Sequence, residues 1–146
     1  MRSIETEIAI RGTPERVWAV LTDFRKYPEW NPFIRDASGE LAIGARLKVR
    51  VHPPDGRPMT FRPTVQQASS ARELRWLGHL GLPGLFDGEH VFRLEPIGPG
   101  QTLFRQSEHF RGILVHIAPN RLFESTRRGF EEMNRALRAI VENARA

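Results

Sequence analysis

Two titratable residues in neighbouring stretches of alternating sequence, Glu108 and His90, are the best placed to transfer a proton. In an extended strand, alternate residues point to the same side. The residues that share a side with Glu108 are Phe104, Gln106 and Phe110. Two phenylalanines on that side predict that Glu108 points into an apolar interior, where burial raises the pKa of a carboxyl group. Such a carboxyl group can act as a general acid or base.

His90 belongs to the preceding alternating stretch. The residues on its side of that stretch are Phe86, Gly88, Phe92 and Leu94. This mostly apolar set predicts that His90 also points inward. Because histidine titrates near neutral pH, His90 beside Glu108 would form a proton-transfer pair.

Each residue also has a structural interpretation. Glu108 could pair with an inward arginine, such as Arg62 or Arg35, or lie at the wet mouth of a pocket. His90 could be a hydrogen-bonded core residue or a polar anchor for a ligand. Strand parity alone does not distinguish these alternatives from catalysis.

Other kinds of chemistry lack their sequence signals. The chain has no cysteine, which excludes thiol catalysis, disulfides and thiolate metal sites. The remaining histidines have no metal-ligand spacing, so no metal site is expected. Nucleophile elbows, phosphate loops and dinucleotide fingerprints are also missing from the sequence, which predicts that the protein uses no cofactor.

Composition predicts one domain over residues 1–146 with its own core. The formal charge is +5, but basic and acidic residues alternate along the chain and no recognition motif accompanies them, so we expect no nucleic-acid partner. The sequence contains no signal peptide and no apolar run of membrane-spanning length. These features predict a soluble, cytoplasmic protein without integral membrane association.

The pattern of the chain predicts an α+β protein with an antiparallel sheet. Residues 3–11 alternate as a strand, and Thr13 caps a short helix that must break within residues 27–32, where two prolines follow in close succession. Turn signals then separate short strands. The predicted strands cover residues 33–37, 41–43, 47–51, 61–67, 73–78, 86–94 and 102–111. Gly78 and Gly88 lie within strands and would allow the sheet to bend.

The last predicted element is an amphipathic helix from Asn120 to about Asn143. Its apolar stripe consists of Leu122, Phe123, Thr126, Phe130, Met133, Leu137, Ile140 and Val141. The stripe could line a cavity between helix and sheet. A completely filled core would produce the same stripe.

The segment from Thr13 to Ile34 carries a family resemblance. It reads Thr-Pro-x-x-Val-Trp and then Tyr-Pro-x-Trp-Asn-Pro-Phe-Ile, and a series of hairpins and a long helix follow it. The whole chain thereby resembles the polyketide cyclase/dehydrase-like branch of the START and birch-pollen-allergen (SRPBCC) superfamily. The resemblance implies a helix-grip fold, in which a curved antiparallel sheet wraps around the long C-terminal helix and encloses a cavity for an apolar ligand. It implies two short helices after the first strand, which plug one end. It also implies that Trp30 and Asn31 lie at the end of that cavity.

Pattern and resemblance together predict a set of ligand-binding residues. They are Trp30, Phe61, Trp76, Phe92, Phe104, Gln106, Phe110, Phe123, Thr126, Phe130, Met133 and Leu137. Trp30 could instead plug the core, and Asn31 could bond the local backbone before proline.

Three functions agree with these predictions. The first is binding of a small hydrophobic or amphipathic molecule, such as a lipid, polyketide, isoprenoid or aromatic compound. The second is a cofactor-independent cyclase or dehydratase in which Glu108 and His90 transfer protons. The third is an adaptor or regulator that binds another protein through its arginine-rich surface.

Overall fold

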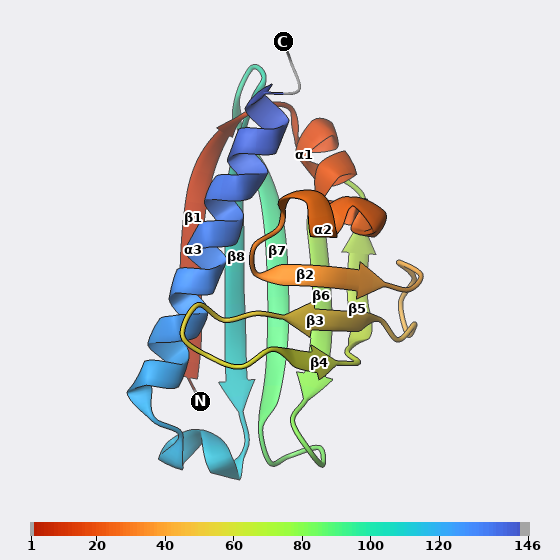
Figure 1. Ribbon diagram of the computed structural model, residues 1–146. Helices are drawn as coiled ribbons and strands as arrows, with labels where there is room; N and C mark the ends of the chain where they lie inside the picture. Colours follow the sequence, from red (N-terminus) through yellow and green to blue (C-terminus); the bar gives the residue numbers. More distant parts are fainter. Residues whose placement is uncertain (1, 144–146) are drawn as a thin grey trace.

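The computed structural model describes residues 2–143, and its main element is a five-stranded antiparallel sheet (Figure 1). The strand order is β1-β8-β7-β6-β5. Its strands are β1 (Arg2–Arg11), β5 (Thr64–Ser69), β6 (Glu73–His79), β7 (Asp87–Gly98) and β8 (Gln101–Arg111). Four of these strands follow one another along the chain through short turns, as expected for a meander.

A second, three-stranded sheet crosses the first at its β5 side (Figure 1). It contains β2 (Ile34–Ser38), β3 (Lys48–Val51) and β4 (Met59–Phe61). Backbone hydrogen bonds join the segment before β3 to β5 and its preceding residue: the amide of Gly44 donates to the Val65 carbonyl, and that of Leu47 to the Pro63 carbonyl, both at 2.8 Å. The two sheets therefore form one curved antiparallel wall.

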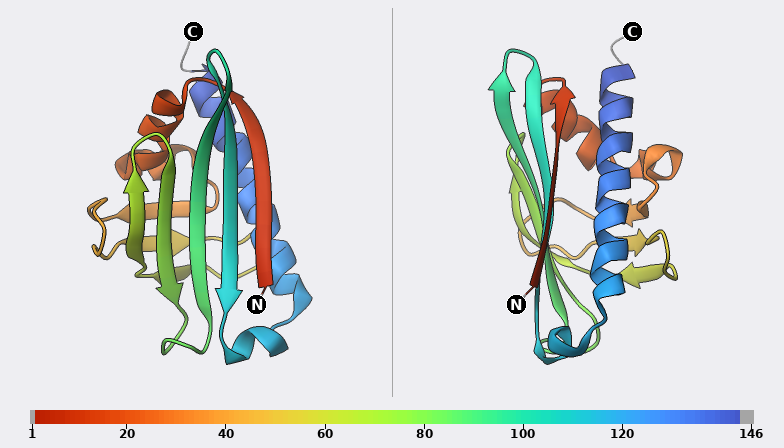
Figure 2. Two further views of the ribbon diagram at one scale, coloured as in Figure 1. Left: turned by 180° about the vertical axis from the view of Figure 1, so that it is seen from behind. Right: turned by 90° about the vertical axis from the view of Figure 1, so that its left-hand side faces the viewer.

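The long helix α3 (Asn120–Asn143) packs against one face of the five-stranded sheet, whereas no helix among residues 2–143 covers the opposite face (Figure 2). Its ends agree with the sequence prediction. The buried face includes Phe123, Phe130, Met133, Leu137 and Val141, whereas Ile140 is partly exposed. This arrangement confirms the predicted α+β helix-grip fold.

Short helical elements lie elsewhere in the chain: α1 (Pro14–Thr22) with η1 (Phe24–Lys26), and η2 (Ile113–Ile117) before α3. A further short helix, α2 (Tyr27–Trp30), follows η1 directly. The hydroxyl of Thr13 accepts a hydrogen bond from the Arg16 amide at 3.2 Å, so the predicted cap is confirmed.

The prediction that the prolines break the helix within residues 27–32 was wrong for Pro28, because Tyr27–Trp30 form α2. Pro28 lies in the first turn of α2, where the missing proline amide has no intrahelical partner to lose. The first helix ends earlier than expected, at Thr22, and Asp23 lies between it and η1.

Two strand predictions also need correction. Residues 41–43 form bends and turns rather than a strand, and the 44–47 segment after them bonds to the β5 region instead. The predicted strand over residues 61–67 is interrupted at residues 62 and 63, because Pro63 cannot donate a backbone hydrogen bond. This break separates β4 from β5 and lets the chain pass from one sheet to the other.

Within residues 2–143, no helix combines the length and the hydrophobicity required to cross a membrane.

A candidate ligand cavity

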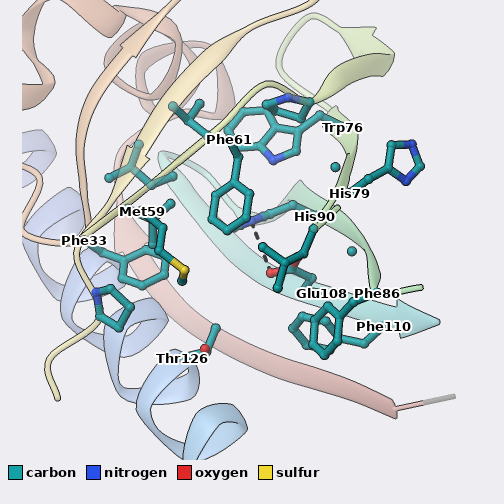
Figure 3. A pocket seen from close by; sticks show the side chains of 18 of the residues that line it. Phe33, Met59, Phe61, Trp76, His79, Phe86, His90, Glu108, Phe110 and Thr126 are labelled. Carbon is teal, nitrogen blue, oxygen red and sulfur yellow. Dashed lines mark ion pairs between the residues drawn. The ribbon is translucent and has the colours of Figure 1, made fainter. Parts of the chain in front are cut away.

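A cavity of about 160 Å³ lies between the crossed sheets and the N-terminal part of α3 (Figure 3). Its walls come from β2–β4 on one side and β6–β8 on the other. The lining residues are Phe33, Ile34, Val49, Val51, Pro53, Met59, Phe61, Pro63, Trp76, Gly78, His79, Leu80, Phe86, Gly88, His90, Glu108, Phe110, Leu122 and Thr126. The lining is therefore mainly apolar, with three titratable side chains, those of His79, His90 and Glu108.

The strand register places His90 and Glu108 next to each other. His90 on β7 lies directly opposite Glu108 on β8, and Trp76 on β6 lies opposite His90 on the other side. The Nδ1 atom of His90 is 3.7 Å from the Oε1 atom of Glu108, the pair joined by the dashed line in Figure 3. This separation is too long for a hydrogen bond, so the two groups do not satisfy each other and both can bond a ligand that lies beside them.

Gly88 makes the space that the Glu108 carboxyl group occupies. A Cβ atom added to Gly88 would lie 2.1 Å from the Oε2 atom of Glu108. Gly78, on the neighbouring strand, has much more room, since the nearest atom to an added Cβ is 3.7 Å away in Pro63. Of Gly78 and Gly88, only Gly88 must be a glycine, because the Glu108 carboxyl group lies where its side chain would be.

A chain of hydrogen bonds beneath the cavity orients His90. The Nε2 atom of His90 lies 2.9 Å from the Oε1 atom of Gln106, and the side-chain Nε2 of Gln106 donates to the Oδ1 atom of Asn134 at 2.7 Å. The side-chain amide of Asn134 in turn donates to the hydroxyl of Thr6 at 2.9 Å, and this hydroxyl donates to the backbone carbonyl of Gln106 at 2.8 Å. Because Oε1 of Gln106 can only accept, Nε2 of His90 carries the proton. Its Nδ1 atom is left as an acceptor on the side of Glu108.

Burial makes both members of the pair uncharged around neutral pH. Desolvation raises the pKa of Glu108 to about 8. Desolvation lowers the pKa of His90 to about 4, although the hydrogen bond to Gln106 opposes the shift. The distance alone would suit a glutamate–histidinium ion pair. However, the side chains are only 18% and 6% exposed, and this burial favours a neutral acid beside a neutral imidazole.

The chain can now be compared with known proteins. A family model described as "Polyketide cyclase / dehydrase and lipid transport" matches residues 1–145. The chain belongs to this family. The resemblance that the Thr13–Ile34 segment suggested is thereby confirmed. A search of curated protein sequences finds no significant match.

Solved structures support the same fold at low sequence identity. A START superfamily protein from Mycobacterium smegmatis is 21% identical, with a TM-score of 0.76, over 97% of this chain and 98% of the other. The aromatase/cyclase Zhui from a Streptomyces species is 16% identical, with a TM-score of 0.80, over 99% and 96%. A norcoclaurine synthase point mutant from Thalictrum is 12% identical, with a TM-score of 0.68, over 99% and 96%. Family and fold together identify a START-like, polyketide cyclase-like ligand-binding domain.

Within this polyketide cyclase-like domain, the structure brings part of the predicted site together. Of the predicted ligand-binding residues, Phe61, Trp76, Phe110 and Thr126 line the cavity, as do both members of the predicted proton-transfer pair. The predicted residues outside the lining are Trp30, Phe92, Phe104, Gln106, Phe123, Phe130, Met133 and Leu137.

The residues outside the lining have other surroundings. Most are core residues with little or no exposed surface, packed between α3 and the sheet, and Gln106 belongs to the hydrogen-bond chain beneath His90. Trp30 packs edge-to-face on Tyr27 at 5.3 Å. The Oδ1 atom of Asn31 accepts hydrogen bonds from the amides of Phe33 and Ile34 at 3.0 and 2.9 Å, a local backbone role.

The sequence analysis missed the lining residues from the three-stranded sheet, especially Val49, Val51 and Met59. Alternation within β3 indicated that the two valines share a face, but not that this face covers a cavity. Phe33 also lines the cavity. Its ring packs directly on Gly129 of α3, where an added Cβ atom would lie only 2.2 Å from the ring. Gly129 thus allows the β2 segment to approach the helix.

Proposed function

We propose that this protein binds a small, mostly apolar ligand that presents one uncharged hydrogen-bond acceptor, such as a carbonyl oxygen, to Glu108. The observation that carries the proposal is the position of Glu108 and His90, 3.7 Å apart and buried in an otherwise apolar cavity, where desolvation favours the uncharged form of both. A protonated carboxyl group donates a hydrogen bond, so it complements an acceptor oxygen. The family description, which includes lipid transport, agrees with an apolar ligand.

The charge of the cavity favours a neutral ligand. None of its lining residues, all within residues 2–143, is a lysine or an arginine. A ligand carboxylate would therefore be desolvated without a cationic partner and would lie beside Glu108, which disfavours its binding.

The cavity volume favours a small ligand. At about 160 Å³, it is close to the roughly 150 Å³ of an engineered cavity that binds benzene and below the roughly 300–1,000 Å³ of pockets for drug-sized ligands. A ligand with one or two rings, or a short branched chain, suits this volume.

The binding proposal can be tested by titrating small aromatic ketones while recording the fluorescence of the tryptophans, since Trp76 lines the cavity. Because the pKa of Glu108 is about 8, we expect affinity for a ketone to fall about tenfold between pH 6 and pH 9 as the carboxyl group ionises. Glu108→Gln keeps a donor and should bind equally at both pH values. Native mass spectrometry of the purified protein would identify any ligand that co-purifies.

Glu89→Gln is the matched control, because Glu89 lies on the outer face of β7 beside Val91 and Arg75. It should reproduce the pH dependence of the original chain. Preference for the carboxylate analogue over the ketone, or an affinity independent of pH in the unsubstituted protein, would contradict the proposal.

The geometry of the pair also favours a second candidate function, the cofactor-independent dehydration of a β-hydroxy ketone. Nδ1 of His90 would remove the proton from the carbon next to the carbonyl, and protonated Glu108 would give its proton to the departing hydroxyl, forming an enone and water. This leaves an imidazolium 3.7 Å from a carboxylate. Proton return from His90 to Glu108 then restores the starting state.

This reaction is tested by the ultraviolet absorbance of the enone formed from a β-hydroxy ketone of suitable size. His90→Ala and Glu108→Gln should each reduce turnover by roughly two to four orders of magnitude, the usual contribution of a positioned acid or base. Glu89→Gln should be without effect. Turnover that survives both site substitutions would remove the pair from any mechanism.

A further inference from the structure

Several large aliphatic side chains are exposed together at one end of the molecule. Leu82 is 71% exposed, and Ile117 and Ile113 are 78% and 67% exposed. Leu80 and Leu114 are also exposed. We call these five residues the apolar tip. They come from the β6–β7 loop and from η2, which lie at the same end of the five-stranded sheet, opposite the β7–β8 turn (Figure 1).

Backbone contacts join the two segments of the apolar tip. The amide of Leu114 donates to the Leu85 carbonyl at 2.9 Å, and that of Ile113 to the Gly84 carbonyl at 3.2 Å. Gly112, with a φ of +124°, permits this contact, since a Cβ atom there would lie 2.3 Å from the Leu85 carbonyl oxygen. The two segments of the apolar tip are therefore held side by side.

The charges around the apolar tip are mainly positive. Residues 80–86 and 112–120 contain no acidic residue, and exposed Arg111 and Arg121 flank the second segment. Asp87, which follows the first segment, contacts the His79 ring nitrogen at 2.7 Å and accepts a hydrogen bond from the Gly84 amide. Its charge is thus partly compensated, and the edge of the apolar tip favours an anionic partner.

The apolar tip also borders the cavity. Leu80 lines the cavity while remaining 49% exposed, and His79 beside it is both exposed and part of the lining. The cavity therefore reaches the protein surface at the edge of the apolar tip. Phe86, at the end of the same loop, forms part of the cavity wall (Figure 3).

We propose that the apolar tip inserts into the surface of an anionic lipid bilayer and holds the cavity entrance against it. Its side chains are aliphatic, whereas protein interfaces are enriched in aromatic residues and methionine, with arginine common to both kinds of surface. Apolar side chains flanked by arginine are what an anionic bilayer surface attracts, because burial and electrostatics then act together. Passage of a ligand from bilayer to cavity rests on the proposed function, but insertion itself does not.

Co-sedimentation with sucrose-loaded vesicles tests the insertion. We expect binding to vesicles of equal parts phosphatidylcholine and phosphatidylglycerol, and much weaker binding to phosphatidylcholine alone. The double substitution Leu82→Glu and Ile117→Glu should lower the vesicle partition coefficient more than tenfold, since it removes two aliphatic side chains and adds repulsion. The matched control is Ile43→Glu, because Ile43 is equally exposed at 71% but lies in the turn between β2 and β3. It should largely retain binding.

Three results would overturn the insertion: no sedimentation of the unsubstituted protein with anionic vesicles, an equal loss of binding for Ile43→Glu, or light scattering that shows the apolar tip joining two copies of the chain. The exposed substitutions should leave the melting temperature unchanged. Ketone binding by the double variant in vesicle-free solution separates the two proposals. If it persists while sedimentation is lost, the cavity functions independently of the apolar tip.

Discussion

The two ends of the space between α3 and the sheet differ, although one apolar helix face lines both. At one end, Met133, Leu137 and Val141 of α3 are completely buried, and α1 packs against α3 there, where the Arg16 side chain donates to the Val141 carbonyl. At the other end, Leu122 and Thr126 face the cavity, which the three-stranded sheet covers. α1 contributes the completely buried side chains of Val17 and Leu21 to the filled interior, whereas the side chains of the three-stranded sheet leave a space beside Leu122 and Thr126. What covers the helix therefore determines whether the space is filled.

The largest expected effect comes from comparing a fully buried phenylalanine of α3 with one whose side chain lines the cavity. Phe130→Ala should lower the free energy of unfolding by about 3–5 kcal/mol, because it leaves a void in a filled core. Phe61→Ala should lower it by only about 1 kcal/mol, because Phe61 is partly exposed and already borders a cavity. Urea denaturation measures both. Equal losses would mean that the two sites are packed equally well.

The next largest effect is the pH dependence of stability that arises from the buried carboxyl group of Glu108. Burial raises the pKa of Glu108 to about 8. Between its unfolded value and this value, the folded protein holds a proton that the unfolded chain lacks, so stability declines as pH rises. The stability of Glu108→Gln relative to the unsubstituted protein should therefore increase by about 1 kcal/mol per pH unit from about pH 5 to 8.

His90 has the opposite influence at lower pH. Burial lowers the pKa of His90 to about 4 in the folded protein. When the pH decreases below the pKa that His90 has in the unfolded chain, the unfolded chain takes up a proton and the folded protein does not, so the stability of the protein falls. Because His90 is present in both proteins, it largely cancels from the difference. Denaturant titrations at several pH values give that difference. A constant value would show that Glu108 is ionised in the folded protein, and Glu89→Gln serves as the control.

The smallest expected effect compares two glycines of the cavity wall. Gly88→Ala should destabilise the protein by about 1–2 kcal/mol, because its Cβ displaces the Glu108 carboxyl group. Gly78→Ala should be neutral or slightly stabilising, since it has space and alanine restricts the unfolded chain. Thermal unfolding with ketone titration measures both variants, and Gly88→Ala should also weaken binding. If the two variants behave alike, the position of the carboxyl group does not depend on Gly88.

The local pattern of the sequence was sufficient for most of the elements. Thr13 caps the first helix as predicted, because a cap depends on neighbouring residues, and α3 begins at Asn120 as expected. Alternation assigned His90 and Glu108 to inward faces, since side chains on a strand have a period of two. The strand prediction failed at residues 41–43 and at Pro63, where the chain passes between sheets and long-range hydrogen bonds determine the conformation.

By itself, the sequence determined which faces of the strands and of α3 are apolar, and therefore which side chains turn inward. Only the tertiary structure decided that His90 lies opposite Glu108, that Asn134 and Gln106 fix its tautomer, and that Phe92, Phe104 and Phe130 lie outside the cavity. The physical reason is that hydrophobic periodicity depends on burial alone. A side chain is equally buried against another side chain or beside a cavity, and which of these occurs depends on segments far away in the sequence.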